Sequence, residues 1–428
     1  MNPQSNAAVK FKPWQIVAAL FVFAVAIRFS TTMLYISYLD MYMNVDWAKG
    51  AAADLFRAYS NVETMDYPPL YIIMLTPIGW LYNNFPVLAE FDPYVLMLIK
   101  SVSILFDSLC VVLIYQIAKK YSKELALVGA ALWAIHPAFF INSAFWGQTD
   151  AILAFILLLS FSRLEKGRPV WGTVIYALAV MTKHQAIYFG PIVLLELLMH
   201  YKPKKILQSI GAAGGVYFAV YLPFMIGLKA PLFFINVYTR AFGMYDFISI
   251  EAFNIYGIFG LSFKPDTTPI LGGFNFTHLG FVFLGLSLGF LVFMYIKAKR
   301  FSPWVGGFLF LQCVFMLTTR MHERYQIIVL PFLLMAWLST RRRDFFWLFT
   351  SISLISACNH FLAIMGYRYA DVLPDARAFS LMGRGFSLVN LAVFVWSIVA
   401  VVKYAFEADA PAGDGSTVSQ NRKELFPT

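Results

Sequence analysis

Apolar residues occur in long runs separated by short polar stretches along nearly the whole chain. A membrane-spanning helix needs about 20 consecutive apolar residues, and shorter helices are tolerated when they are packed among neighbours or face a cavity. The pattern therefore predicts an all-α polytopic membrane protein with about 12 transmembrane helices. The twelve runs are residues 14–36, 93–118, 124–141, 148–163, 170–182, 186–200, 206–226, 278–297, 303–319, 325–339, 344–365 and 383–405.

Composition agrees with this pattern. Of the 428 residues, 60% are hydrophobic and only 13% are charged, whereas soluble globular domains average about 25% charged residues. The formal net charge of +10 could suggest a nucleic-acid partner. The Lys and Arg residues lie in short loops between apolar runs, however, which is typical of membrane topology. The sequence therefore predicts a bilayer environment and no nucleic-acid partner.

Charge also predicts the orientation of the chain. With residues 1–13 taken as a cytoplasmic N-terminal segment, all short basic segments lie on the inner side, as the positive-inside rule requires. Residues 14–405 then form the membrane domain, and residues 406–428 form a flexible cytoplasmic tail. The basic segments are residues 10–12, 119–123, 163–168, 202–205, 297–300, 341–343 and 403–423.

One further apolar run, Tyr67 to Tyr82, is interpreted as interfacial. It opens with Pro68-Pro69, and proline suits the first turn of a helix. If it crossed the membrane, the basic segment at 119–123 would fall on the wrong side. The outer, extracytoplasmic face then receives a first loop (37–92) that carries interfacial helices, and a long loop (227–277).

Four acidic residues of the first loop are candidates for chemistry: Asp40, Asp46, Asp54 and Asp66. Taken alone, Asp40 could be a solvated loop acid, and Asp46 and Asp54 are best interpreted in that way. Asp66 could instead cap the helix that follows it, because Asp is favoured at the N-cap.

A polar turn with Trp146, Gln148 and Asp150 is expected on the same outer face. Trp146 could be an ordinary interface aromatic, because Trp is enriched where a helix meets the membrane surface. Gln148 and Asp150 stand where a helix begins, so they could serve as caps.

Cationic groups expected on the outer face are harder to explain as solvated charges at the ends of helices. Arg320, His322 and Arg324 lie within five residues, and Glu323 can neutralise one of them. Lys183 and His184 come from another outer turn. Surplus positive charge of this kind suits a phosphate, although internal ion pairing with Asp40, Asp66, Asp107 or Asp150 is the alternative. For the intramembrane Asp107, Arg28 and Lys183 are the candidate partners.

Together these residues predict a cavity that opens to the outer face and the bilayer, with carboxylates on one wall and cations on the other. A lipid-linked phosphosugar would match it: the prenyl tail stays in the membrane, the phosphate meets the cations and the sugar faces a carboxylate. The sequence has no G-x-x-x-x-G-K-[ST] motif, which argues against an ATPase.

Several motifs resemble the GT-C superfamily of polyprenyl-phosphate-sugar-dependent integral membrane glycosyltransferases. The chain is similar to bacterial mannosyltransferase-like members, to dolichyl-phosphate-glucose glucosyltransferases and to the first GPI mannosyltransferase. The ordered motifs, which run from residue 40 to residue 325, are Asp40 followed by Trp47-Ala48; Asp66-Tyr67-Pro68-Pro69; Trp146-Gly147-Gln148-Thr149-Asp150; Lys183-His184-Gln185; and Thr319-Arg320-Met321-His322-Glu323-Arg324-Tyr325.

The resemblance implies a GT-C-like helical bundle and an inverting transferase that needs neither a metal nor a cofactor. It implies that Asp40 is the general base. The chain has Lys183-His184-Gln185 where such proteins often have Lys-Pro-Gln, and Asp46 beside Trp47 is a second candidate acid. The expected donor-phosphate residues are Arg320, His322, Arg324 and Lys183. The expected substrate-binding residues are Asp66, Tyr67, Trp146, Gln148, Asp150, His184 and Glu323.

The predicted function is transfer of a hexose, mannose or glucose, from a polyprenyl-phosphate donor to a lipid-linked, glycan or protein acceptor. We expect this on the extracytoplasmic side of a bacterial inner membrane. Two alternatives stay open: a transporter or flippase of an anionic lipid or sugar, and an oligosaccharide ligase or polymerase with a diphosphate-linked donor. A transporter would have its binding groups near the bilayer midplane, whereas the polar residues of this chain gather at one face.

Overall fold

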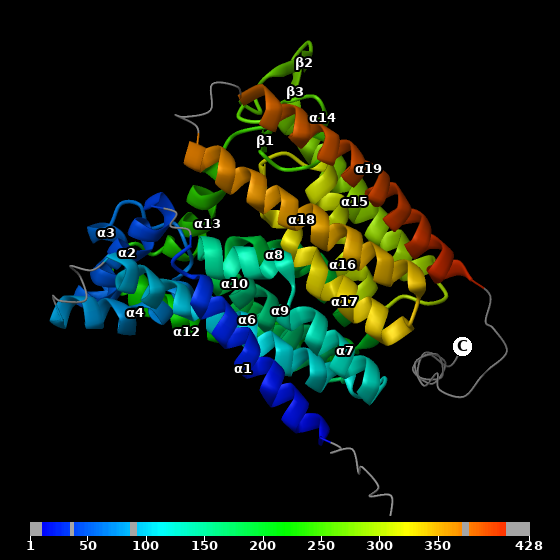
Figure 1. Ribbon diagram of the computed structural model, residues 1–428, viewed down its shortest axis with the longest axis horizontal. Coiled ribbons are helices and arrows are strands. Elements are labelled where there is room, and N and C mark those ends of the chain that lie inside the picture. Colours follow the sequence, from blue (N-terminus) through cyan, green and yellow to red (C-terminus); the bar gives the residue numbers. More distant parts are fainter. Residues whose placement is uncertain (1–10, 35–37, 86–91, 370–375, 408–428) are drawn as a thin grey trace, which may run out of the picture.

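Helices make up most of the chain that the computed structural model describes, namely residues 11–34, 38–85, 92–369 and 376–407 (Figure 1). Residues 408–428 of the predicted C-terminal tail and most of the predicted N-terminal segment lie outside these ranges, whereas Phe406 of that tail still belongs to a helix. The helices of the first half are α1 (Pro13–Thr31), α2 (Tyr38–Ala53), η1 (Leu55–Arg57), α3 (Ala58–Asn61), α4 (Pro69–Asn84), α6 (Asp92–Ala118), α7 (Lys123–Ala134), α8 (Pro137–Phe140), η2 (Ile141–Trp146), α9 (Asp150–Glu165), α10 (Pro169–Thr182), η3 (His184–Phe189) and α11 (Gly190–His200).

The second half adds helices and four very short strands. The helices are α12 (Pro203–Gly227), α13 (Phe233–Gly243), α14 (Ile255–Ile258), α15 (Phe276–Lys297), α16 (Pro303–Leu317), η4 (Tyr325–Ile328), α17 (Val329–Thr340), α18 (Arg343–Tyr369) and α19 (Ala376–Phe406). Strand β1 (Ser249–Ile250) pairs in parallel with β4 (Met321–His322), and β2 (Pro269–Leu271) pairs antiparallel with β3 (Phe274–Asn275). The first pair joins the segment between α13 and α15 to the segment that carries the predicted cations.

Local sequence signals explain where many helices begin. Proline occupies the first turn of α4, α8, α10, α12 and α16, where its missing N–H removes no helical hydrogen bond. Side-chain caps start others: Ser122 accepts from the backbone N–H of Leu125, and Asn275 accepts from that of His278. These contacts satisfy backbone donors that the first helical turn leaves unpaired.

The membrane prediction holds for the fold class but not for the number of spans. Every one of the twelve apolar runs contains a helix. Among the described residues, six helices are long and apolar enough to cross a membrane. A seventh candidate is the pair Lys123–Ala134 and Pro137–Trp146, which is bent by 40° at the break. The protein is therefore an all-α polytopic membrane protein, and twelve spans are not confirmed.

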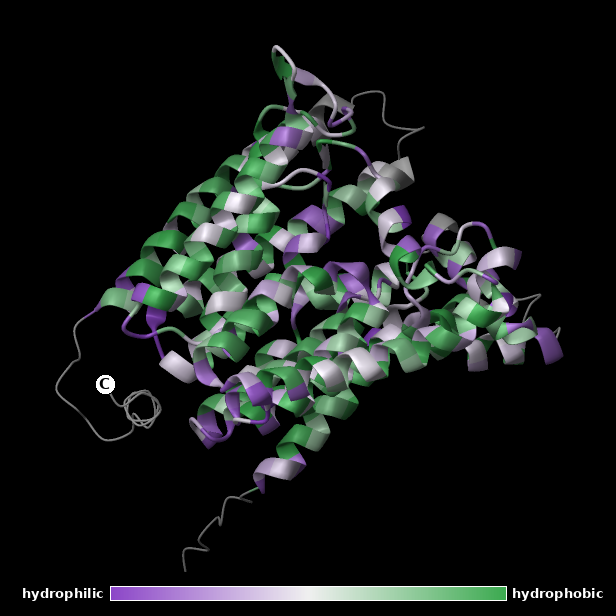
Figure 2. Cartoon of the chain, turned by 180° about the vertical axis from the view of Figure 1, so that it is seen from behind, coloured by the Kyte–Doolittle hydropathy of each residue, from purple (hydrophilic) through white to green (hydrophobic). Residues whose placement is uncertain are grey.

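The shorter helices lie inside the bundle. Every residue of α16 from Pro303 to Met316 is buried, and α17 and α9 are almost as fully enclosed. By contrast, few residues of α1, α12 and α15 are buried, and large side chains such as Leu207 and Phe281 lie on the surface. A helix that is hydrophobic all round is buried in a core or spans a membrane, and hydrophobic residues predominate along most of the helices (Figure 2).

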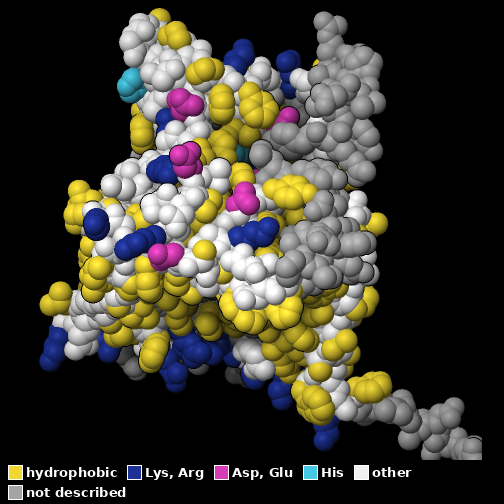
Figure 3. Space-filling model, turned by 90° about the vertical axis from the view of Figure 1, so that its left-hand side faces the viewer, with side chains coloured by type: hydrophobic (Ala, Val, Ile, Leu, Met, Phe, Trp, Pro, Cys, Tyr) yellow, Lys and Arg dark blue, Asp and Glu magenta, His cyan; other side chains and the backbone are white. Residues whose placement is uncertain are grey.

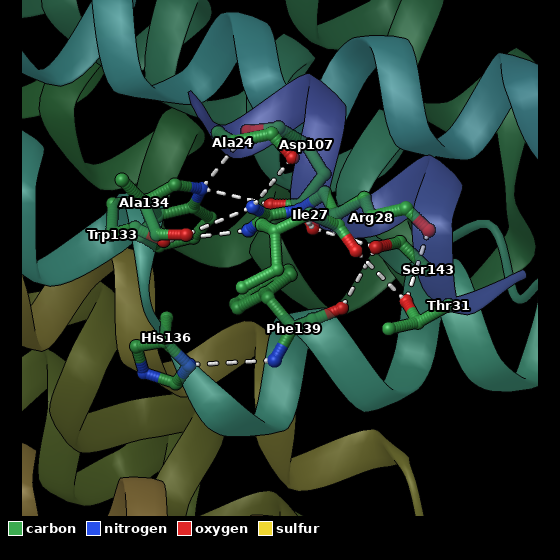
Figure 4. A network of polar contacts seen from close by, with 10 residues as sticks. All are labelled: Ala24, Ile27, Arg28, Thr31, Asp107, Trp133, Ala134, His136, Phe139 and Ser143. Carbon is green, nitrogen blue, oxygen red and sulfur yellow. Dashed lines mark hydrogen bonds and ion pairs between the residues drawn. The ribbon is translucent and has the colours of Figure 1, made fainter. Parts of the chain in front are cut away.

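A buried polar network joins α1, α6, α7 and η2 (Figure 4). Nε of Arg28 lies 2.6 Å from Oδ2 of Asp107, and both side chains are fully buried. Ser143 donates to the same carboxylate oxygen, and the indole of Trp133 donates to Oδ1. Arg28 also donates to the backbone oxygen of Ala134. Arg28 is therefore the partner of Asp107, which satisfies the buried charge expected from the sequence.

Helices α15 to α19 lie together in one group, and α1, α6, α7, α9, α10 and α12 lie in another, with α2, α3 and α4 to one side (Figure 1). Helix α4 packs closely along α2, because Gly79 has no side chain at the contact. A Cβ at Gly79 would lie 1.8 Å from the backbone oxygen of Ala48. The close packing of α2 and α4 fixes the helix that carries Asp40.

On the surface, Lys and Arg gather along one edge below an apolar band, whereas acidic and basic groups mix above that band (Figure 3).

Candidate functional site

A cavity of about 480 Å³ lies where five segments of the chain meet. The segments are α2, the residues before α4, the turn after η2, the loop that follows α13, and the stretch from β4 to η4, and the first residue of η3 adds a sixth. Its walls combine carboxylates, an arginine and several aromatic rings. The lining residues are Asp40, Met43, Asn44, Trp47, Asp66, Tyr67, Gln148, His184, Tyr245, Arg324 and Tyr325.

Asp40 stands in the first turn of α2, and two side chains from the other side of the cavity bind it. The indole Nε1 of Trp146 donates to Oδ2 of Asp40 at 2.7 Å, and Nε2 of Gln148 donates to the same oxygen at 3.1 Å. The structure thus joins three residues that the sequence predicted for one site. Asp46 is exposed and does not line the cavity, and Asp54 accepts from the backbone N–H of Arg57 as the cap of η1.

The turn with Trp146 and Gln148 has its shape because η2 is a π-helix that ends at Gly147. Gly147 has φ +84°, a left-handed conformation that favours glycine. A Cβ there would also lie 2.7 Å from Sδ of Met41 and 2.9 Å from Cγ of Lys100. π-Helical turns inside helices are frequent at functional sites, and this one directs two neighbouring side chains toward Asp40.

Lys100 anchors the same turn from α6. Its side chain is fully buried, and Nζ donates to the backbone oxygens of Thr32 at 2.8 Å and Phe145 at 2.7 Å. Thr32 follows the last residue of α1, and Phe145 precedes Trp146. Lys100 therefore ties the end of α1 to the turn that binds Asp40.

Asp66 supplies a second carboxylate to the cavity. The N-cap of α4 is Pro68, which has no side-chain cap, so the capping alternative for Asp66 is wrong. Burial raises the pKa of Asp66 to about 6, although Arg324 and Arg240 oppose the shift. Among the described residues, Oδ1 of Asp66 is buried with no hydrogen-bond partner. This carboxyl group is therefore set to change its ionisation near neutral pH.

Tyr67 adds an aromatic wall beside Asp66. Its ring lies 5.3 Å from the ring of Trp47, 5.2 Å from that of Tyr71 and 6.3 Å from that of His184. Burial raises the pKa of Tyr67 above its ordinary value, so its hydroxyl stays protonated and can donate a hydrogen bond.

Lys183 and Asp150 form a buried ion pair behind the cavity. Nζ of Lys183 lies 2.7 Å from Oδ1 of Asp150, and both side chains are 1% exposed. Asn142 donates to the other oxygen of Asp150 at 3.0 Å and lies 3.2 Å from Nε2 of His360. Asp150 thus does not act as a helix cap, and the charge of Lys183 is already matched.

Arg324 is the cationic side chain that reaches the cavity wall. Nη1 lies 2.7 Å from Oε1 of Glu323, and the guanidinium lies 5.7 Å from the ring centres of both Trp146 and Tyr325. Burial alone would raise the pKa of Glu323, but Arg324 holds this pKa down to about 2. Nε of Arg324 is buried and has no partner among the described residues, so it can donate one more hydrogen bond.

The other members of the predicted cationic cluster differ from the expectation. Burial lowers the pKa of His322, and it lowers the pKa of His184 to about 3, so both rings are neutral at pH 7. Nε of Arg320 lies 2.7 Å from Oδ2 of Asp266, and Arg320 is not among the lining residues. Of the four predicted phosphate contacts, Arg324 is therefore the one that places a positive charge at the cavity wall.

Several residues at the site were not predicted individually. Trp47, Tyr325 and Gln185 stood inside the quoted motifs and were assigned no role, although Trp47 and Tyr325 line the cavity. Asn44 lies one helical turn after Asp40, and its amide donates to the backbone oxygen of Asp40 at 2.6 Å. Tyr245 lies between α13 and β1, where the sequence offers no signal that would single it out.

Comparison with known proteins supports the resemblance. The family model described as dolichyl-phosphate-mannose-protein mannosyltransferase matches residues 79–226. This range contains Trp146, Gln148, Asp150 and Lys183, but neither Asp40 nor the segment around Arg324. No curated protein matches the chain. Together with the helical membrane fold, the match over these residues supports a similarity to mannosyltransferase-like membrane glycosyltransferases of the GT-C type.

Proposed function

We propose that the protein uses this cavity to transfer a hexose, mannose or glucose, from a polyprenyl-phosphate donor to a hydroxyl of a lipid-linked, glycan or protein acceptor. The observation that carries this proposal is the pairing of Asp40 with Trp146 and Gln148 on a wall shared with Arg324. A carboxylate and a cation then flank one space, which matches an acceptor hydroxyl and a leaving phosphate. The resemblance implies that this family needs no metal.

Asp40 is the proposed general base. The acceptor oxygen attacks the anomeric carbon, and its proton passes to Asp40. The new carbon–oxygen bond forms on the face opposite the phosphate, so the configuration of the sugar inverts. A positioned base of this kind contributes roughly 10²–10⁴-fold to the rate. The two N–H donors on Oδ2 hold the carboxylate in one orientation while this happens.

Arg324 is the proposed contact for the departing phosphate. The bond between the anomeric carbon and the phosphate oxygen breaks, and the phosphate keeps the electron pair. Negative charge grows on that oxygen, so a buried cation nearby stabilises the transition state. The unpartnered Nε of Arg324 can donate to it, and the neutral rings of His184 and His322 each hold a buried nitrogen with no partner in the described structure.

The unpartnered polar atoms near the cavity support a polar substrate. Most buried polar atoms in proteins have a hydrogen-bond partner, so an accumulation of exceptions points to groups that a ligand satisfies. Among the described residues, the exceptions on or beside the cavity lining are Oδ1 of Asp66, Nδ1 of His184, Nε2 of His322 and Nε of Arg324. Sugar hydroxyls can donate to and accept from such atoms.

A donor screen with the purified protein tests this function. Defined polyprenyl-phosphate mannose and glucose are offered with lipid-linked, glycan and peptide acceptors, and transfer of labelled sugar is measured. The same sugars on polyprenyl diphosphate test the ligase alternative, and anion uptake into liposomes that contain the protein tests the transporter alternative. We expect transfer from a monophosphate donor that Asp40→Asn abolishes. Uptake without any transfer would contradict the proposal.

The side of the membrane and the compartment belong to the same proposal. Along the chain, the basic loops alternate with the loops that line the cavity, so the two sets are expected on opposite sides of the membrane. We therefore place the cavity on the extracytoplasmic face of a bacterial inner membrane. The surface distribution of Lys and Arg along one edge of the molecule supports this orientation (Figure 3).

A further inference from the structure

Arg320 donates hydrogen bonds to four residues of the described chain, none of which lines the cavity. Its backbone N–H donates to the oxygens of Phe247 at 3.1 Å and Ile248 at 3.2 Å. Its side chain donates from Nε to Asp266 at 2.7 Å and from Nη1 to the backbone oxygen of Phe242 at 2.8 Å. Phe242 lies in the last turn of α13, and the other three partners lie in the loop between α13 and α15. Arg320, which directly precedes β4, therefore holds the end of α13 and the following loop.

The backbone of Arg320 also has an unusual conformation. Its φ of +63° is left-handed, and a non-glycine residue adopts this region only when its surroundings hold it there. Asp266 closes the arrangement: its side chain is fully buried, its N–H donates to the oxygen of Asp246 at 2.8 Å, and its own oxygen accepts from the N–H of Thr277 at 2.9 Å. The ion pair thus joins the loop, β4 and the first turn of α15.

Tyr245 lies in the middle of the segment that Arg320 holds, residues 242–248. It lines the cavity, and its ring meets the ring of His322 edge to face at a centroid distance of 4.7 Å. Tyr245 is 38% exposed, so part of the ring is available to a ligand. A sugar presents an apolar C–H face that an aromatic ring can cover.

We propose that Arg320 is a positioning residue that pins residues 242–248 over the cavity, and that the pinned Tyr245 contacts the bound hexose. The pin follows from the hydrogen bonds alone, whereas the role of Tyr245 rests on the proposed function. This assignment differs from direct binding of the donor phosphate by Arg320. In the pin, Asp266 is the essential partner of Arg320; in direct phosphate binding, Asp266 competes with the donor.

Substitution of Asp266 separates these two roles. Asp266→Ala removes the acceptor of the ion pair and leaves Arg320, which is 34% exposed on its side chain, free to meet an anion. The pin predicts that Asp266→Ala and Arg320→Gln have the same effect. Direct phosphate binding predicts that Asp266→Ala leaves donor use unchanged or improves it. The double variant Arg320→Gln/Asp266→Ala leaves no unpaired charge, so it replaces Arg320→Gln in this comparison if that single variant fails to fold.

The first measurement is hydrogen–deuterium exchange of the full-length protein in detergent. In the pin, residues 244–250 exchange faster in Asp266→Ala and in the double variant than in the wild type. Arg342→Gln is the matched control, because Arg342 forms a comparable ion pair with Glu407, remote in sequence from the loop; this variant should leave exchange of residues 244–250 unchanged. Unchanged exchange in both loop variants would overturn the pin.

The second measurement is transfer kinetics. We expect Tyr245→Ala to raise KM by on the order of ten-fold with a smaller effect on kcat, and Tyr245→Phe to stay near the wild type, because the ring and not the hydroxyl makes the contact. Asp266→Ala should raise the same KM, and its combination with Tyr245→Ala should be no worse than Tyr245→Ala alone, because both act through one contact.

The two measurements fail in different ways. Faster exchange with wild-type kinetics in Tyr245→Ala would overturn the sugar contact and keep the pin. A lower KM for the donor in Asp266→Ala would overturn the pin in favour of direct phosphate binding by Arg320. Absence of transfer by the wild-type protein would instead count against the proposed function, and exchange alone would then decide the pin.

Discussion

The indole of Trp146 lies between Asp40 and Arg324. Nε1 donates to Oδ2 of Asp40 at 2.7 Å, and the guanidinium of Arg324 lies 5.7 Å from the ring centre. One side chain therefore spaces the proposed base from the proposed phosphate contact. A relationship of this kind fixes geometry that the transfer reaction needs, because misplacement of catalytic groups costs rate steeply.

The first prediction concerns the base. Asp40→Asn keeps the shape of the side chain but cannot take the proton, so we expect kcat to fall by roughly 10²-fold or more while the donor still binds. Asp46→Asn is the matched control on the same helix, because Asp46 is exposed and lies outside the cavity lining. Steady-state transfer and donor binding are measured for both. Near-normal turnover in Asp40→Asn with loss in Asp46→Asn would show that Asp46 is the base.

The second prediction tests the indole hydrogen bond. Trp146→Phe keeps an aromatic ring and removes the N–H, and a hydrogen bond to a charged group is worth about 1.5–3 kcal/mol. We therefore expect kcat to fall roughly ten- to a hundred-fold, and Tm to fall modestly because a buried hydrogen bond is lost. Trp171→Phe is the control, since Trp171 is 64% exposed on α10. Unchanged kcat in Trp146→Phe would mean that Gln148 alone orients the carboxylate.

The third prediction concerns the buried pair of Arg324 and Glu323. Arg324→Gln leaves the carboxylate of Glu323 buried without its partner, which costs about 3–5 kcal/mol, so we expect a lower Tm. Arg324→Gln/Glu323→Gln removes both charges and should recover most of that stability. In this double variant kcat/KM for the donor should still fall roughly ten- to a hundred-fold, because the phosphate contact is lost. Wild-type donor kinetics in the double variant would remove Arg324 from the site.

The fourth prediction is a pH dependence of stability from Asp66. Burial raises the pKa of Asp66 from 3.8 to about 6, so the folded state binds the proton more tightly than the unfolded state. Stability is then fully supported below pH 3.8 and declines as pH rises toward about 6. The shift corresponds to about 3 kcal/mol. Asp66→Asn carries no charge, so it should stabilise the protein at pH 7 and lose this advantage at pH 4.

Thermal unfolding of the wild type and Asp66→Asn across this pH range measures the difference. Asp46→Asn is the control, because its exposed carboxylate is not subject to the same burial. A difference between Asp66→Asn and the wild type that does not vary between pH 4 and pH 7 would contradict a buried, ionisable Asp66.

The fifth prediction concerns topology. Leu271 in β2 is 81% exposed in the long loop, and Lys204 lies exposed in the first turn of α12. We expect Leu271→Cys to react with an impermeant thiol reagent in intact cells and Lys204→Cys to react only after the membrane is opened. The opposite labelling pattern would place the cavity on the cytoplasmic face.

The sequence alone determined the class of fold and most of the helices. Each of the twelve apolar runs contains a helix, because hydrophobic length and the position of proline act locally along the chain. The order of the motifs also predicted that Asp40, Trp146 and Gln148 would meet, and they do. The number of spans was not determined in this way, since a short helix buried by its neighbours has the same composition as a short span.

Only the tertiary structure decided how the charges are shared. From the sequence, Arg320, His322, Arg324 and Lys183 read as one cationic cluster, but each meets a different environment in the fold. Arg320 pairs with Asp266, 54 residues away, and Lys183 pairs with Asp150, 33 residues away. Burial keeps His322 neutral. Pairing and desolvation depend on distances of a few ångströms between distant segments, and the spacing of residues along a chain does not contain those distances.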